Sequence, residues 1–202
     1  AAEHAGTGPV PILALRLADA EAPPAVVEAA LEACHALAPH DDVLNALAKA
    51  HVPMRACAAI TRAADAGEER ILRHGCLVLE MCVRTDGASH NFGELFAAAS
   101  RALEAATGAS VEAAAALVAA LAVGAEGSGG LLGMDEKLRL GDGTTDDEEL
   151  SAQLDDMLQS EGFADLVDRV VNTPSILAAV DDAAHKGTAP DAADLLPAIT
   201  EA

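Results

Sequence analysis

The chain has 202 residues, a formal net charge of −21 and a composition that is 51% hydrophobic but only 1% aromatic. Alanine supplies most of the apolar share, and alanine favours helices, whereas strands are enriched in aromatic and β-branched residues. Phosphate groups are bound by Lys and Arg, so 12 basic against 33 acidic residues argue against binding to nucleic acid or to an anionic membrane surface. The composition therefore predicts an all-α protein that suits a basic protein partner or simply remains soluble.

The cysteines lie in apolar helical stretches and form no CxxC pair, which predicts buried free thiols. They are Cys34, Cys57, Cys76 and Cys82. Free thiols indicate an intracellular, reducing compartment, either the cytoplasm or an organelle. No run reaches the ~18 apolar residues that a membrane span needs, and no signal-peptide pattern is present. Because the chain begins at Ala1 without Met, we expect a processed protein or a fragment of a longer one.

The first cycle of elements covers residues 10–50. A helix is predicted over residues 10–20, with Pro11 in its first turn, where a missing N–H costs nothing. A longer helix follows to residue 38, with apolar residues at i, i+3, i+4 and i+7 spacing. A short helix, capped by Asp41 or Asp42, then continues to residue 50.

The second cycle restarts at Val52. Helices are predicted over residues 52–64, 68–83, 91–99, 101–107 and 110–123. Ser110 is expected to cap the last of these, with Glu112 in its first turn.

The pattern then changes. Residues 124–133 are glycine-rich, and Thr145 with Glu148 matches a capping box that begins a helix extending to residue 160. Further helices are predicted over 162–171, 174–185 and 191–200. We therefore divide the chain into repeats (1–123), a Gly-rich and acidic linker or insertion (124–145) and a C-terminal helical cap (146–202) that continues the array.

Several residues recur at an interval of 42 positions. Val10-Pro11 returns as Val52-Pro53, and residues 27–31 (VEAAL) resemble residues 111–115 (VEAAA) two intervals later. Cys34 returns as Cys76, and leucine occupies Leu37, Leu79 and Leu121. Self-similarity with such a period is typical of a solenoid of stacked helices.

The cycle of short, middle and long helix, with a Gly-x-Val-Pro hinge before the middle helix, resembles the armadillo repeat. The matching hinges are Gly8-Pro9-Val10-Pro11 and Ala50-His51-Val52-Pro53, and the matching third helices are residues 26–38, 68–83 and 110–123. The resemblance covers about residues 8–123. It implies a short right-handed α-solenoid of three-helix repeats, with an atypical helical C-terminal cap, that binds peptides or proteins along a groove lined by third helices.

In the nuclear-import adaptors of that family, the groove carries a ladder of Trp and Asn residues. The positions that align with Trp hold Glu32, His74 and Ala116, and those that align with Asn hold Ala36, Val78 and Ala120. The ladder is absent, so the resemblance does not imply binding of nuclear localisation signals.

The motifs that would indicate chemistry are incomplete. His35 and His74 lie on long helices of successive repeats, but a zinc site needs three or four ligands and no third is apparent. Residues 142–153 lack the Gly and Glu that an EF-hand loop needs at its sixth and twelfth positions. Residues 127–130 lack the Lys-Ser/Thr of a P-loop, and no nucleophilic set is evident. We predict no metal, no cofactor and no enzymatic activity.

Two functions are consistent with these patterns. One is a non-enzymatic scaffold or structural subunit of a larger assembly, and the other is a peptide-binding adaptor whose acidic groove recognises a basic segment. The candidate partner-binding residues are Glu28, Glu32, His35, Arg70, His74, Asp146, Asp147, Glu148 and Glu149. A third interpretation is a plain bundle with accidental spacing, in which neighbouring long helices would be antiparallel instead of parallel and stacked about 10 Å apart.

Overall fold

The structure is a computed structural model that describes residues 8–38, 41–85, 92–123, 158–159 and 161–187. Within these ranges every regular element is an α-helix, so the predicted all-α fold is confirmed. The helices are α1 (Pro9–Ala18), α2 (Pro24–Leu37), α3 (Asp41–Lys49), α4 (Val52–Ala66), α5 (Glu69–Thr85), α6 (Phe92–Ala105), α7 (Ala109–Val123), α10 (Glu161–Asn172) and α11 (Pro174–Gly187).

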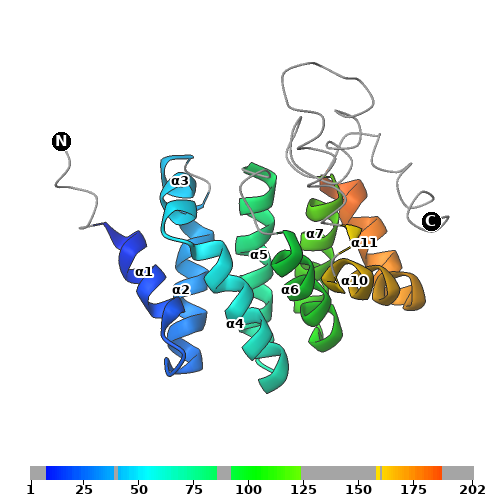
Figure 1. Ribbon diagram of the computed structural model, residues 1–202, viewed down its shortest axis with the longest axis horizontal. Helices are drawn as coiled ribbons and strands as arrows, with labels where there is room; N and C mark the ends of the chain where they lie inside the picture. The colour runs from blue at the N-terminus through cyan, green and yellow to red at the C-terminus, as the bar shows by residue number, and fades with distance from the viewer. Residues whose placement is uncertain (1–7, 39–40, 86–91, 124–157, 160, 188–202) are drawn as a thin grey trace, which may run out of the picture.

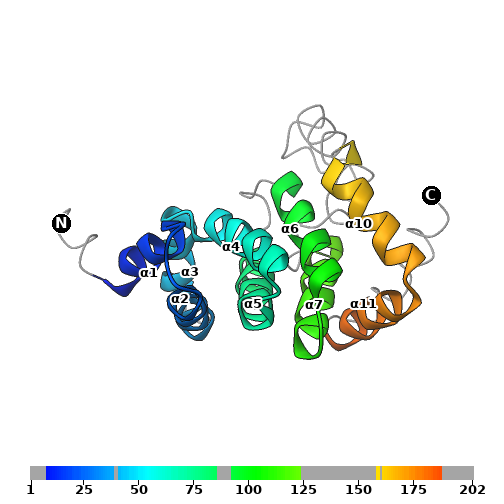
Figure 2. The same cartoon turned by 90° about the horizontal axis from the view of Figure 1, so that it is seen from below.

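The helices are arranged in two rows (Figures 1 and 2). In one row α1 packs against α4, α4 against α6, and α6 against α10. In the other row α2 packs against α5, α5 against α7, and α7 against α11. The short helix α3 precedes α4 and contacts both rows. In Figure 1 the helices α2, α5 and α7 run in the same direction, because each follows a helix of the first row that runs the opposite way.

Helix boundaries follow the backbone-restricting residues of the sequence. Pro11 and Pro53 lie in the first turns of α1 and α4, where proline stabilises a helix start. Gly67 ends α4 in the left-handed conformation, with φ of 71°, and glycine adopts this conformation without a Cβ penalty. His51, immediately before α4, also has a positive φ of 54°. This hinge therefore places a non-glycine residue in a conformation that costs about 1 kcal/mol or more.

Two local predictions are wrong. The sequence predicts separate helices over 91–99 and 101–107, but α6 is continuous from Phe92 to Ala105. The reason is that neither Gly nor Pro interrupts residues 94–105, and Ser100 is buried within the helix instead of ending it.

The second wrong prediction concerns Ser110, which does not precede α7 as its cap. It lies inside the first turn, where its hydroxyl accepts a hydrogen bond from the N–H of Thr107 at 2.9 Å. The helices predicted to end at residue 160 and to span 191–200 are not tested, because they lie mainly or wholly outside the described residues.

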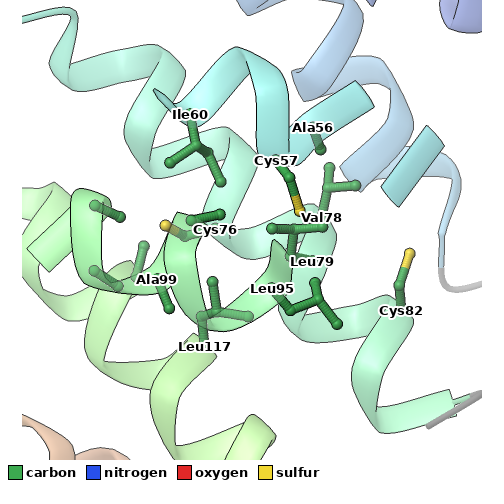
Figure 3. Packing of buried hydrophobic residues seen from close by; sticks show 14 of the residues in the cluster. Ala56, Cys57, Ile60, Cys76, Val78, Leu79, Cys82, Leu95, Ala99 and Leu117 are labelled. Carbon is green, nitrogen blue, oxygen red and sulfur yellow. The ribbon is translucent and has the colours of Figure 1, made fainter. Parts of the chain in front are cut away.

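The core lies between the rows and is made of small and branched apolar side chains (Figure 3). Gly75 of α5 faces Ile60 of α4 so closely that an added Cβ would lie 2.7 Å from its Cγ1 atom. The glycine therefore allows α4 and α5 to approach each other. All four cysteines are free and buried, which confirms that part of the prediction.

The most enclosed helix is α7, which contacts α5, α6 and α11. Between Ala113 and Leu121 every residue except Ala116 is buried. A helix that is apolar on all sides forms the interior of a protein instead of its surface. Within the described residues, none of the helices combines the length and apolar character needed to cross a bilayer.

Candidate partner-binding surface

The structure brings together the predicted site residues that belong to two neighbouring helices. Glu28, Glu32 and His35 lie on α2, and Arg70 and His74 lie on α5, which packs against α2 in the same row. The remaining candidates, residues 146–149, lie outside the described part of the chain. The surface of α2 and α5 around these five residues is named the α2–α5 surface below.

An ion pair connects the two helices across the α2–α5 surface. The Nη1 atom of Arg70 lies 3.2 Å from Oε1 of Glu28 and donates a hydrogen bond to it. The side chain of Arg70 is 80% exposed, whereas that of Glu28 is 26% exposed. Water screens such a pair, so it contributes about 0–1 kcal/mol to stability. Its main significance is geometric, because it shows which residues of successive helices face each other.

His74 lies half-buried beside this pair. Its Nδ1 atom is buried and has no hydrogen-bond partner among the residues that the structure describes. Burial lowers the pKa of His74, and Arg73 and His35 add to this effect, while Glu32 and Glu28 oppose it by favouring the charged imidazolium. The imidazole is therefore neutral at neutral pH. The α2–α5 surface thus presents carboxylates, guanidinium groups and an uncharged imidazole, which is a mixed polar surface instead of a purely acidic one.

The positions that align with the armadillo ladder do not form one surface. Glu32 and Ala36 are exposed, while His74 and Ala116 are half-buried. Val78 and Ala120 are fully buried in the core. A partner could not contact these last two side chains, so the aligned positions do not line a common groove in this structure.

A second polar cluster, missed by the sequence analysis, connects three helices of the first row. Arg101 of α6 pairs with Asp65 of α4 and, at 2.7 Å, with Glu104 of its own helix. Arg169 of α10 lies 3.4 Å from Glu104, and its Nε donates to the hydroxyl of buried Ser100 at 3.3 Å. The i,i+3 spacing of Arg101 and Glu104 was a usable sequence signal. Nothing in the sequence connected Arg169 to either residue.

The described residues hold no group of three or more His, Cys, Asp or Glu side chains placed to bind a metal ion. The cysteine thiols are also unsuited to nucleophilic chemistry. Burial raises the pKa of Cys57 and of Cys76 to about 12, and that of Cys34 to about 11, so these thiols stay protonated.

Comparison with known protein families, curated proteins and solved structures finds no match to this chain. The class that the structure itself defines is an all-helical protein built from two rows of stacked helices.

Proposed function

We propose that this chain is a non-enzymatic scaffold or structural subunit, a short right-handed α-solenoid of armadillo-like repeats that binds other proteins within a larger assembly. The observation that supports this proposal most directly is the packing of helices in two rows, with α2, α5 and α7 as parallel neighbours. A plain bundle would place neighbouring helices antiparallel. In a repeat array, each unit contacts its neighbours and the side surfaces remain available along the whole length.

The chemistry of the cysteines and of the ion-paired side chains in the described part of the chain is consistent with this role. The described thiols are buried and protonated, and the polar clusters are made of paired Arg and carboxylate side chains. Such clusters orient helices and contact partners, but they provide no activated nucleophile. A scaffold binds its partners through the area and shape of its surface, and two rows of helices provide both.

The experiment is affinity capture of the tagged chain from native lysate at low and high salt, with the captured proteins identified by mass spectrometry. A structural subunit is expected to retain a fixed set of partners at both salt concentrations. A chain that captures nothing reproducible under either condition would contradict the proposal.

The second candidate function is a peptide-binding adaptor that recognises a basic segment through acidic residues. The observation that favours it is the exposure of Glu32 beside the partly exposed Glu28 on α2. The ion pair between Arg70 and Glu28 argues against this candidate, because the Glu28 carboxylate already contacts a basic side chain of the same protein. An adaptor of this type would lose its partner at high salt, because screening weakens attraction between exposed charges.

A charge-matched pair of variants separates the two functions. Glu28→Gln with Glu32→Gln removes two carboxylates from the α2–α5 surface, and Glu21→Gln with Asp165→Asn removes two exposed carboxylates elsewhere. An adaptor loses affinity in the first variant alone. A structural subunit retains its partners in both.

A further inference from the structure

The unpaired Nδ1 atom of His74 is exceptional in this protein. Among the described residues it is the one buried side-chain nitrogen or oxygen atom without a hydrogen-bond partner. Folded proteins pair nearly all of their buried polar atoms, because an unpaired atom loses the hydrogen bonds that water gave it in the unfolded chain. The position and surroundings of His74 therefore call for a physical explanation.

His74 lies at the contact between α2 and α5. Arg70 of α5 pairs with Glu28 of α2. About one helical turn further along each helix, at a spacing of four residues, lie His74 on α5 and Glu32 on α2. Because α2 and α5 run in the same direction (Figure 1), the register of the ion pair places His74 beside Glu32.

The contact between α2 and α5 joins the first three helices to the rest of the protein. Of the contacts that α1, α2 and α3 make with α4 and α5, the packing of α2 on α5 is the most extensive. The helices are also close at the next residue, since a Cβ atom added to Gly75 would lie 3.8 Å from Cδ1 of Leu31 on α2. A local change at His74 therefore affects how α1, α2 and α3 are attached.

Burial and charge act on His74 in opposite directions. Burial lowers its pKa and is the largest influence, while Glu32 and Glu28 of α2 raise the pKa. Arg73 of its own helix and His35 of α2 lower it further. Among the described residues, the other helices that contact α5, namely α3, α4, α6 and α7, provide no charged group that shifts this pKa. The position of His74 therefore favours the neutral imidazole although two carboxylates are close.

The chemistry of the imidazole explains why protonation is unfavourable at this position. A neutral imidazole carries one proton and can leave Nδ1 as an unprotonated acceptor, whereas an imidazolium carries an N–H on both nitrogens. Protonation would therefore create a buried, charged donor at Nδ1 with no acceptor, which costs more than an unpaired neutral atom. Turning the ring outward relieves this cost, because Glu32 is exposed to water and can accept the new hydrogen bond.

We propose that His74 makes the α2–α5 contact sensitive to acid. Its neutral imidazole is part of the contact, and when Nδ1 takes up a proton the ring turns outward toward Glu32 and the contact loosens. A histidine is suited to this role because its charge changes close to neutral pH. The proposal goes beyond the scaffold function, because it concerns a contact within the chain and holds whether or not a partner binds.

The pH range follows from the direction of the shift. The ordinary pKa of a histidine is 6.5, and that of His74 in the folded protein is lower. As the pH falls below 6.5, a loosened chain takes up this proton before the closed form does. The loosened form therefore binds more protons, so the closed contact is fully stable above pH 6.5 and loses stability as the pH falls through the lower pKa.

The first test is hydrogen exchange of the full chain at about pH 7.5 and about pH 5.5, on either side of the histidine range. The rates are corrected for the intrinsic pH dependence of amide exchange and are compared between α2 and α7. Protection of α2 should fall in acid by at most about tenfold per pH unit, the limit for uptake of one proton. Protection of α7, one step further along the row, should change less.

Two variants show whether His74 carries this response. His74→Leu fills a similar space and cannot take up a proton, so its α2 helix should keep its protection in acid. His51→Gln removes an exposed histidine outside the α2–α5 surface and should respond like the wild-type chain. Circular dichroism at pH 7.5 checks that both variants fold. Equal acid sensitivity of α2 in the wild-type chain and in His74→Leu overturns the proposal, as does a wild-type α2 that does not respond.

The second test is an NMR titration of the His74 ring, which needs no variant of His74 itself. The midpoint in the wild-type chain should lie below the ordinary 6.5. Glu32→Gln should move the midpoint to lower pH, and His35→Gln should move it to higher pH, because the two residues act on His74 in opposite directions. A loss of packing alone would not produce these opposite shifts. A wild-type midpoint at or above 6.5, or a midpoint that Glu32→Gln does not change, overturns the proposal.

Discussion

The guanidinium group of Arg70 lies 3.2 Å from the carboxylate of Glu28, and the two residues are separated by 42 positions, the interval at which the sequence repeats. In this pair, two residues one interval apart in the sequence face each other across the neighbouring helices α2 and α5. Because the Arg70 side chain is 80% exposed, its loss should have little effect on stability. Arg70→Ala is expected to lower the free energy of unfolding by less than about 0.5 kcal/mol in urea denaturation.

The effect of Arg70→Ala on stability can be compared with that of Arg101→Ala, which removes a more connected ion pair. Arg101 is half-exposed and contacts Asp65 and Glu104, and Glu104 in turn contacts Arg169. Networks of charges contribute more than isolated exposed pairs, so the expected loss is about 1 kcal/mol. A larger loss for Arg70→Ala than for Arg101→Ala would contradict this ranking.

Gly75→Ala tests the close approach of α4 and α5. Alanine is better than glycine in a helix by about 0.5–1 kcal/mol, but overpacking a core costs about 1–3 kcal/mol. The new Cβ would lie 2.7 Å from Cγ1 of Ile60, which is fully buried and cannot move freely. We therefore expect a net loss of about 1 kcal/mol in the free energy of unfolding.

A double-mutant cycle identifies the cause of that loss. Ile60→Ala should cost less in the Gly75→Ala background than in the wild-type chain, because the two changes share one space. Gly8→Ala is the control, since no atom lies within 4 Å of a Cβ added there. Strictly additive effects of the first two changes would exclude the contact as the source of the destabilisation.

His51→Gly should stabilise the protein. His51 is exposed and has a φ of 54°, a conformation in which a Cβ atom is strained by about 1–2 kcal/mol. Glycine removes the strain but loses more chain entropy on folding, which leaves a gain of about 0.5–1 kcal/mol. His51→Ala retains the Cβ and should give no gain. Equal midpoints of thermal unfolding for the two variants would show that the backbone is not strained.

The buried cysteines predict a loss of stability in alkali. The ordinary thiol pKa is 9.0, whereas burial, followed for Cys57 by the charge of Glu94, raises the pKa of Cys57 and Cys76 to about 12. Between pH 9 and 12 the unfolded chain releases these protons while the native protein keeps them. The unfolded state therefore binds fewer protons, and stability falls as pH rises.

The measurement is the free energy of unfolding as a function of pH above 8. The Cys57→Ala/Cys76→Ala variant loses some packing and is less stable at every pH. The comparison is therefore between the slopes of the free energy of unfolding against pH in the two proteins, and not between its absolute values. A shallower slope in the variant is expected. Identical slopes would mean that the thiols do not carry the effect.

The helix boundaries that the sequence predicted correctly are those marked by residues with restricted or unusual backbone conformations. Pro11 and Pro53 each lie in the first turn of a helix, as expected, and Gly67 ends α4. The prediction failed in α6, where two helices were expected but one continuous helix forms, because residues 94–105 contain neither Gly nor Pro.

The candidate site was predictable only where it followed the repeat. Glu28, Arg70 and His74 meet because α2 packs against α5, and 42 positions separate Arg70 from Glu28. Arg169 and Ser100 are 69 residues apart and belong to a part of the chain without a recurring partner, so no pattern predicted their contact. The burial of the His74 Nδ1 atom likewise depends on neighbouring helices, which sequence spacing alone does not place.

The enclosure of α7 has a consequence for how this protein can change over evolutionary time. Ala114 and Ala120 have no exposed surface, and neighbouring helices lie on several sides of α7. A larger side chain at either position would have to displace a whole helix, because a packed interior has no spare volume. Substitutions should therefore accumulate on exposed parts of α2 and α10 long before they are tolerated in α7. Related chains would be recognised most readily by its run of small residues.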